Sequence, residues 1–421
     1  MRTRPRPRTA LLLAAAALLL PAAATPLAGA APTAGPAAPA STATASAAGP
    51  GTVVLDWERV AMRTVYTEAA TPIPVGIPYL GFTSVAMHRA ARWADHRDAS
   101  GPAAVAVAAH GVLAAYFPAS RAALDAALAT SLASVPPGSD RTGGMHVGAD
   151  AARRMVSERA DDGRGDATVV YDVPAGPGVW QPAPGTTMLA PWLGSVDPLL
   201  SDRPIRVDGP DGLRSWAYAM DYLEVMRTGG ATGADRTARQ TETVGFFTAN
   251  AATMVGEALV EHLAAEPMSL RRTTGLFAAM HGAMTDAIIT CWRLKRDVGF
   301  WRPVEAIRGA ASDGNPATVP DPAWTPLLPT PPYSDYVSGH GCVTSPATEV
   351  IRRVLGEETS LTLRTPTLSR TYPTLSAIEH DAFNARIWGG LHFRDAMEDA
   401  YSIGHQAARN ALHALGAHHR R

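Results

Sequence analysis

The sequence predicts an all-α fold: a helical bundle with a long Gly/Pro-rich loop region and little or no strand. Apolar residues make up 46% of the 421 residues but aromatic residues only 6%, and alanine is abundant. This composition favours helices over a β-sandwich. From Asp56 onward, apolar residues recur at the three- and four-residue spacing of amphipathic helices. No repeat of fixed period accompanies this pattern, so we expect a bundle of about ten helices.

The N-terminal half predicts five helices and then a long irregular segment. The expected helices span residues 56–69, 74–97, 103–116, 120–132 and 141–160. Residues 164–199 contain many Gly and Pro residues; 167–173 suit a short strand, and 174–191 a loop. A loop of this length in a helical protein often folds over a functional site.

The C-terminal half returns to helical spacing, with one further interruption. Expected helices span residues 212–228, 235–265 with a break, 268–298, 339–355, 375–383 and 396–415. The stretch 310–337 holds seven prolines and is predicted to be loop.

The beginning of the chain has the pattern of an export signal. Arginines within residues 1–8, an apolar run at 10–20 and the small residues Ala28-Gly29-Ala30 are typical of a Sec-type signal peptide over residues 1–30. The apolar run is too short to span a bilayer. Residues 31–51, made of Ala, Pro, Ser, Thr and Gly, predict a disordered leader. We expect residues 52–421 to form a single helical catalytic domain that is secreted as a soluble protein without a membrane span.

Charge and cysteine content narrow the class of partner. The net charge is −1, and loss of the four arginines of residues 1–8 would make it about −5, so we expect no nucleic-acid partner. The only cysteines, Cys291 and Cys342, are either bridged after export or two small buried thiols.

Three short motifs within residues 291–399 carry the chemistry. The first contains Lys295, which is the only lysine of the chain, and Arg302 seven residues later. Two helical turns would place both on one face, although Gly299 and Pro303 suggest a kink. Arginine forks and a lysine supply the donors and the positive charge that a tetrahedral oxyanion needs.

The other two motifs add backbone donors and histidines. Ser338-Gly339-His340 is expected to start a helix, with Ser338 as N-cap and Gly339 exposing N–H groups to an anion. Arg386 and His392 flank a Gly-Gly turn that allows the backbone to pass close to a ligand or another helix. Each motif alone also fits an ordinary surface or packing role.

Taken together, the order and spacing of these motifs resemble one superfamily. It comprises the vanadium-dependent haloperoxidases and the acid phosphatases of the phosphatidic acid phosphatase type 2 (PAP2) group, which share a helical bundle and an anion pocket. The details resemble the haloperoxidase branch, with the matching runs Cys291-Trp292-Arg293-Leu294-Lys295, Phe300-Trp301-Arg302-Pro303, Pro331-Pro332-Tyr333 and Trp388-Gly389-Gly390-Leu391-His392-Phe393-Arg394.

This resemblance implies a vanadate cofactor, without haem or nucleotide, and a reaction in which hydrogen peroxide oxidises halide to a hypohalous-acid equivalent for an organic acceptor. It implies that His392 ligates vanadium and that His340 is the acid–base group. The vanadate oxygens would be held by Lys295, Arg302, Ser338, Gly339 and Arg386, with Trp292 and Tyr333 near the halide.

The chain departs from the family pattern at three positions. Val337 replaces the usual proline, Ala385 replaces a serine, and Ala396 stands where an aspartate usually follows the histidine ligand. The last change removes the expected acceptor for the ring of His392. Two alternative functions stay open: a non-specific acid phosphatase on the same scaffold, with His392 forming a phosphohistidine, and a non-catalytic phosphate- or vanadate-binding helical protein. The preference for chloride or bromide is not predicted.

Overall fold

The computed structural model describes residues 51–416, and these residues form the predicted all-α fold. The predicted signal peptide at 1–30 and all of the predicted leader except Gly51 lie outside the described residues. Among the described residues, no helix combines the length and the apolar character needed to cross a membrane. The thirteen α-helices of this part of the chain exceed the predicted number of about ten, because the predicted element 235–265 is divided into α7 and α8 and the short helix α10 was not predicted.

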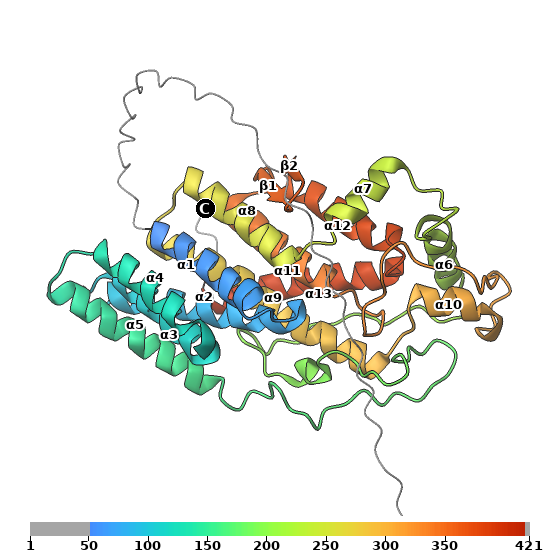
Figure 1. Ribbon diagram of the computed structural model, residues 1–421, viewed down its shortest axis with the longest axis horizontal. Coiled ribbons are helices and arrows are strands. Elements are labelled where there is room, and N and C mark those ends of the chain that lie inside the picture. The colour runs from blue at the N-terminus through green and yellow to red at the C-terminus, as the bar shows by residue number, and fades with distance from the viewer. Residues whose placement is uncertain (1–50, 417–421) are drawn as a thin grey trace, which may run out of the picture. The chain divides into compact units, whose positions relative to one another are not determined.

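The first five helices follow the predicted order closely. They are α1 (Thr52–Met62), α2 (Ile73–Asp95), α3 (Gly101–Tyr116), α4 (Arg121–Ala133) and α5 (Ser139–Glu158), with a π-helical turn at Arg63–Glu68. Ser100 caps α3 by accepting from the Ala103 N–H, as expected for serine at this position. Helices α3 and α5 pack on each other and on α2, at the left of Figure 1.

Eight further helices follow, and α9 is the longest of them. They are α6 (Trp216–Thr228), α7 (Ala238–Phe246), α8 (Ala251–Ala265), α9 (Leu270–Val298), α10 (Pro303–Gly309), α11 (Gly341–Leu355), α12 (Leu375–Trp388) and α13 (Arg394–Ala414). The predicted break within 235–265 lies between α7 and α8, where Asn250 caps α8. The unpredicted α10 begins with Pro303, a residue well suited to a first helical position.

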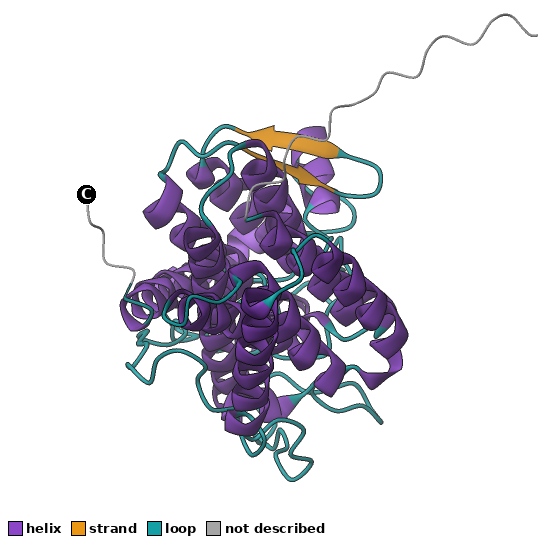
Figure 2. Ribbon diagram, turned by 90° about the vertical axis from the view of Figure 1, so that its left-hand side faces the viewer, coloured by secondary structure: helices purple, strands orange, loops and turns teal. Residues whose placement is uncertain are grey.

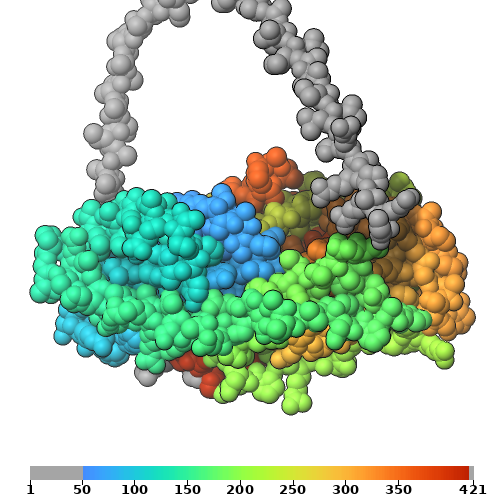
Figure 3. Space-filling view, turned by 60° about the horizontal axis from the view of Figure 1, so that its bottom comes forward, coloured from blue at the N-terminus to red at the C-terminus, as the bar shows by residue number. Residues whose placement is uncertain are grey.

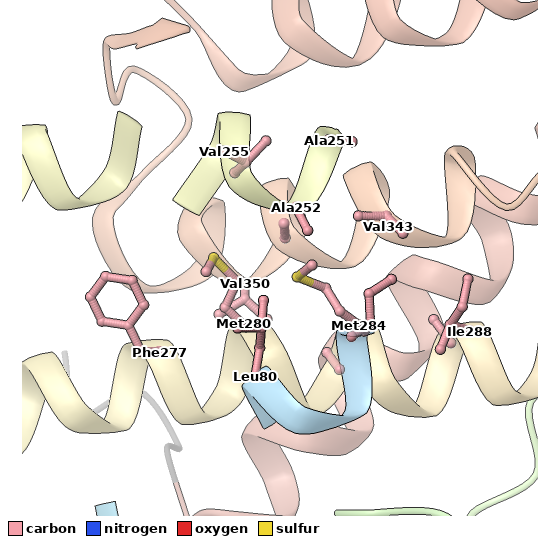
Figure 4. Packing of buried hydrophobic residues seen from close by; sticks show 14 of the residues in the cluster. Leu80, Ala251, Ala252, Val255, Phe277, Met280, Met284, Ile288, Val343 and Val350 are labelled. Atoms are coloured by element: carbon pink, nitrogen blue, oxygen red, sulfur yellow. The ribbon is translucent and has the colours of Figure 1, made fainter. Parts of the chain in front are cut away.

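Helix α9 is buried because its neighbours cover it on several sides. Helices α2, α11 and α13 all pack against it. Met280 and Met284 of α9 meet Leu80 of α2 and Val350 of α11 in the main apolar core (Figure 4). Burial of side chains of this size contributes about 1.5–3 kcal/mol each. The core therefore fixes α9, and with it the position of Lys295 near its C-terminal end.

The Gly/Pro-rich segment is an irregular loop, and the strand predicted at 167–173 is absent. Residues 160–200, green in Figure 3, lie across one face of the helices. The loop is anchored to the chain after α9, because Trp180 N–H donates to Gly299 O (2.7 Å) and Trp301 N–H donates to Gly178 O (2.9 Å). The prolines at 174, 177, 182, 184 and 191 lie after the predicted strand and disfavour strand pairing of the segment that follows it.

The only sheet among the described residues is a small hairpin of strands β1 (Leu361–Arg364) and β2 (Ser369–Tyr372). The strands are antiparallel, with Leu361 opposite Tyr372 and Arg364 opposite Ser369. The hairpin lies at the edge of the helices in Figure 2 and contacts α8 and α12. It takes no part in the candidate site described below.

Candidate active site

A turn after α9 brings the first motif together. Helix α9 ends at Val298, and Gly299 adopts the left-handed conformation (φ 60°) that terminates many helices. The chain resumes at α10, where the Arg302 N–H donates to Glu305 Oε2 (2.9 Å). Lys295 and Arg302 thus reach one region through a turn, and not along a continuous helix face. Both side chains are fully buried.

The second motif forms a loop whose helix begins later than predicted. Helix α11 starts at Gly341, two residues after the expected position. His340, and not the predicted Ser338, occupies the N-cap position, although Ser338 Oγ accepts from the Gly341 N–H (3.3 Å). The Ser338 N–H donates to Ala396 O (2.9 Å), so the backbone at the position of the missing aspartate holds this loop.

Gly339 lies close to the side chains of Trp292 and Lys295. A Cβ atom at this position would lie 3.1 Å from the Trp292 ring and 4.0 Å from Lys295 Cε. Within the described part of the chain, the Gly339 N–H has no hydrogen-bond acceptor. The site therefore offers a free backbone donor beside the lysine.

The third motif places Arg386 in the last turn of α12 and His392 just beyond the Gly-Gly turn. Gly390 has φ 73°, and a Cβ atom there would lie 2.5 Å from Gly229 O. The glycine turn therefore allows close packing against another backbone segment, which is one of the two roles expected for it. Arg386 is 8% exposed and His392 is 2% exposed.

Backbone carbonyls hold the two cations of the first motif in place. Lys295 Nζ donates to Ser334 O (2.7 Å) and Asp335 O (2.9 Å). Arg302 donates from Nε to Tyr333 O (2.9 Å) and from Nη1 to Leu391 O (2.7 Å). These bonds join the ends of all three motifs around one point.

Burial lowers the pKa values of the basic side chains in the site, which favours their neutral forms. Desolvation lowers the pKa of Lys295 to about 7 and that of Arg386 to about 10. Desolvation also lowers the pKa of His392 well below its usual value, and Arg302, Lys295, Arg386 and His340 add to this effect through their charges. A group of cations this close in the interior favours a bound anion.

An aspartate orients His392 from an unexpected place in the chain. Asp335 Oδ1 lies 2.7 Å from His392 Nδ1, and both side chains are buried. The two atoms are close without the alignment of a hydrogen bond. On the other side of the ring, Arg302 Nη1 lies 3.2 Å from His392 Nε2. Together these contacts favour the tautomer with the proton on Nδ1 and a lone pair on Nε2.

Three buried nitrogen atoms around this point have no partner among the described residues. They are Arg302 Nη2, Arg386 Nε and His340 Nε2. Buried polar atoms without partners are rare in folded proteins because each costs about 1–3 kcal/mol. Arginine donors left open beside a free backbone N–H suit a tetrahedral oxyanion, so the residues present fit such a group. The one carboxylate in the cluster, Asp335, is directed at His392.

Two aromatic side chains form one wall of the site. The rings of Trp292 and Tyr333 have centroids 5.1 Å apart, and Lys295 Nζ lies 4.9 Å from the Tyr333 centroid. Trp292 Nε1 donates to Leu189 O (2.9 Å), which ties the long loop to this wall. The expectation that the loop covers the site is therefore supported by a direct contact.

The structure brings together all nine predicted site residues, but sequence reasoning missed Asp335. An acidic residue in the loop between Tyr333 and Ser338 was the available signal, and it lacked the periodicity that identifies a helix face. His380 of α12 is exposed and pairs with Asp381. Cys291 and Cys342 are free buried thiols, in line with one of the two predicted states.

Comparisons with known proteins agree with this geometry. The family model described as VCPO second helical-bundle domain matches residues 275–421, which contain all three motifs. No curated protein matches the sequence. Among the solved structures that match, a crystal structure described as the first bacterial vanadium-dependent iodoperoxidase has a TM-score of 0.71 at 20% identity, covering 87% of this chain and 97% of that chain.

A second match is an apo-type bacterial vanadium-dependent chloroperoxidase, with a TM-score of 0.67 at 17% identity, covering 82% of this chain and 94% of that chain. The resemblance expected from the motifs is confirmed by these matches. Residues 275–421 therefore carry the VCPO second helical-bundle domain, and the chain has the fold of the vanadium-dependent haloperoxidases.

Proposed function

We propose that the protein is a vanadate-dependent haloperoxidase, in which hydrogen peroxide oxidises halide to a hypohalous-acid equivalent for an organic acceptor. The observation that carries this proposal is the ring of unpartnered buried nitrogens, Arg302 Nη2, Arg386 Nε and His340 Nε2, around the oriented ring of His392. The structural neighbours described as an iodoperoxidase and a chloroperoxidase support it.

The proposed roles follow from the contacts of each side chain. His392 would ligate vanadium through Nε2, with Asp335 fixing the ring from Nδ1. The residues that would hold the oxygens are Lys295, Arg302, Ser338, Gly339 and Arg386. Bound in this way, vanadate would supply a Lewis-acidic centre that activates peroxide toward halide.

His340 is the group that we propose moves a proton. Burial, followed by the charge of Arg386, lowers its pKa well below the usual value, so the ring is neutral at neutral pH. A neutral imidazole with an unpartnered Nε2 accepts a proton from arriving hydrogen peroxide. The Trp292 and Tyr333 rings form the wall beside which we place the halide.

A phosphatase is the second candidate, because the Asp335–His392 pair also suits a nucleophile. In that reaction His392 Nε2 forms a bond to phosphorus, the ester P–O bond breaks, and His340 donates a proton to the leaving alkoxide. The structural neighbours described as an iodoperoxidase and a chloroperoxidase favour the haloperoxidase over this reaction. We therefore place the haloperoxidase first.

Paired activity assays test the proposal. Purified protein is incubated with orthovanadate, hydrogen peroxide and bromide, and halogenation of a phenol is followed; a vanadate-free sample is given an aryl phosphate. We expect vanadate-dependent halogenation. Hydrolysis without halogenation would instead identify the phosphatase, and saturable phosphate binding without turnover would identify a binding protein.

Elemental analysis tests the ligand separately from activity. His392→Ala should lose stoichiometric vanadium after gel filtration, whereas His380→Ala, an exposed histidine on α12, should keep it. Retained vanadium in the first variant would refute the assignment of His392. Export through residues 1–30 is part of the proposal, and cleavage near Ala30 on secretion, read by N-terminal sequencing, tests it.

A further inference from the structure

A second basic site lies at the opposite end of α9. A cleft of about 1110 Å³ is bounded by the first turn of α9, the C-terminal turns of α11 and α13, and part of α2. Its lining contains no aspartate or glutamate but includes six arginines: Arg92, Arg203, Arg271, Arg272, Arg353 and Arg409. Arg271 is 24 residues before Lys295 on one helix, hence about 36 Å from it. The cleft is therefore separate from the candidate active site.

Most of these arginines have no partner among the described residues. Arg353 pairs with Glu349 (2.6 Å), and Arg203 Nη2 lies 3.0 Å from His413 Nε2. Within residues 51–416, the guanidinium groups of the other four make no hydrogen bond, ion pair or ring contact: Arg92, Arg271, Arg272 and Arg409. The cleft thus concentrates positive charge that the described part of the protein does not neutralise.

The start of α9 makes this concentration costly. Arg271 and Arg272 occupy the first turn of the helix, and that turn carries no acidic residue. The positive end of the helix dipole favours acidic residues there and disfavours cations. Such a local conflict, without compensation nearby, is typical of a functional site.

A buried histidine at the cleft is affected by the charge of these arginines. His88 is only 6% exposed, and its Nδ1 lies 3.2 Å from Thr274 Oγ1. Desolvation, and then the charges of Arg92 and Arg271, lower its pKa to about 4. No hydrogen bond to its Nε2 is present among the described residues, so this nitrogen is open to a ligand.

We propose that this cleft binds an oligophosphate, a short chain of condensed phosphate groups. Neutralising four unpaired guanidiniums takes four negative charges, whereas one phosphate group carries about −1.5 to −2. Arginine forks match phosphate oxygens in pairs. The lining holds no Phe, Tyr or Trp on which a nucleobase would stack, so the ligand is the phosphate chain itself.

Calorimetric titration of the whole protein with tripolyphosphate tests this site. We expect one saturable binding event in wild type, and about a ten-fold or larger rise in Kd for Arg271→Gln/Arg272→Gln. Arg293→Gln removes an exposed arginine from the same helix outside the cleft and should change the Kd less than two-fold. Monophosphate should bind the cleft far more weakly than tripolyphosphate.

The candidate active site is itself an anion pocket. A comparison of Lys295→Met with the double arginine variant therefore separates binding in that pocket from binding in the cleft. Lys295→Met should leave tripolyphosphate binding unchanged, because Lys295 lies at the other end of α9. Loss of binding in Lys295→Met with retention in the double arginine variant would overturn the proposal, as would equal binding of citrate and tripolyphosphate. Circular dichroism of each variant establishes that a lost signal is not a lost fold.

Discussion

Asp335 Oδ1 lies 2.7 Å from His392 Nδ1, and this contact joins the loop before Ser338 to the loop after α12. The position where the motif pattern expected an acid, Ala396, contributes only its backbone carbonyl, which accepts from the Ser338 N–H. The carboxylate beside the histidine ring therefore lies in a loop, about 60 residues before the position in the following helix where the motif pattern expected it.

Replacing Asp335 should affect two ligands in opposite directions. Asp335→Ala removes the group that orients His392, so the Kd for vanadate should rise about ten-fold or more. Burial raises the pKa of Asp335 to about 7, so above this pH the same change removes a negative charge from the pocket, and phosphate, held by charge alone, should bind equally or more tightly. Both affinities are measured by calorimetry, and Asp335→Asn, which keeps an acceptor, should recover part of the vanadate affinity.

Asp297→Ala is the control, because this exposed acid on α9 pairs only with Arg296 among the described residues. Weaker binding of both anions in Asp335→Ala would mean that the pocket had collapsed. An unchanged vanadate affinity would contradict the positioning role.

Much of the fold was predictable because helix periodicity survives in a single sequence. The predicted boundaries of the helix that carries Lys295 differ from those of α9 by two residues at one end and none at the other. The hairpin β1–β2 was missed because each strand has only four residues, too few for alternation to be distinguished from chance. The helix α10 was missed because its seven residues are too few to show a helical period.

The site was predictable to the level of residue type but not of contact. Motif order identified Lys295, Arg302 and His392, yet no pattern shows that Lys295 donates to the carbonyls of Ser334 and Asp335. Those bonds depend on how a loop folds, and loops carry no periodic signal. Asp335 was missed because its role depends on its contact with His392, which only the folded structure shows.

Lys295→Met should weaken anion binding without unfolding the protein. Methionine fills nearly the same buried volume, and removing a fully buried cation offsets the loss of two hydrogen bonds. The Kd for vanadate should rise about ten-fold or more, because a charge-assisted contact is lost. Calorimetry gives the affinity, thermal unfolding gives the stability, and full affinity in this variant would remove Lys295 from the site.

Trp292→Phe should loosen the loop that covers the site. The indole N–H donates to Leu189 O, and Leu189 N–H in turn donates to Pro332 O (3.0 Å). Losing the first bond costs about 1 kcal/mol, which corresponds to about five-fold faster amide exchange at Leu189 if the loop opens locally. Hydrogen exchange read by mass spectrometry measures this change.

Trp324→Phe is the matched control, since its indole donates to Met226 O (3.1 Å) in a different cluster. Exchange at Leu189 should stay at the wild-type rate in this variant. Equal acceleration in both variants would show a general loss of stability instead of a local loosening.

The buried pair Glu58 and His281, away from the site, should make the free energy of unfolding depend on pH. Glu58 Oε2 lies 3.3 Å from His281 Nδ1, and Ser84 Oγ contacts both side chains at 2.8 Å. Burial raises the pKa of Glu58 to about 8 and lowers that of His281 to about 3. The folded pair therefore keeps one proton between these values.

The sign of each contribution follows from the unfolded pKa values, 4.5 for Glu58 and 6.5 for His281. Above pH 4.5 the folded state holds a proton on the pair that unfolded Glu58 has lost, so this carboxyl destabilises the fold increasingly up to pH 8. His281 acts oppositely up to pH 6.5, because its unfolded form binds the extra proton. The two effects cancel between pH 4.5 and 6.5, and the free energy of unfolding then falls by about 2 kcal/mol toward pH 8.

Glu58→Gln removes the first contribution. The difference in unfolding free energy between wild type and this variant should therefore shift by about 2 kcal/mol, against wild type, between pH 6.5 and 8. Urea unfolding at both pH values measures it. The control is Glu257→Gln, which changes a half-exposed carboxyl group on α8. Burial raises the pKa of this carboxyl, but its contact with solvent limits the effect on stability, so the variant should follow wild type across this window. Parallel pH profiles for wild type and Glu58→Gln would mean that the pair exchanges its proton at the same pH whether folded or unfolded.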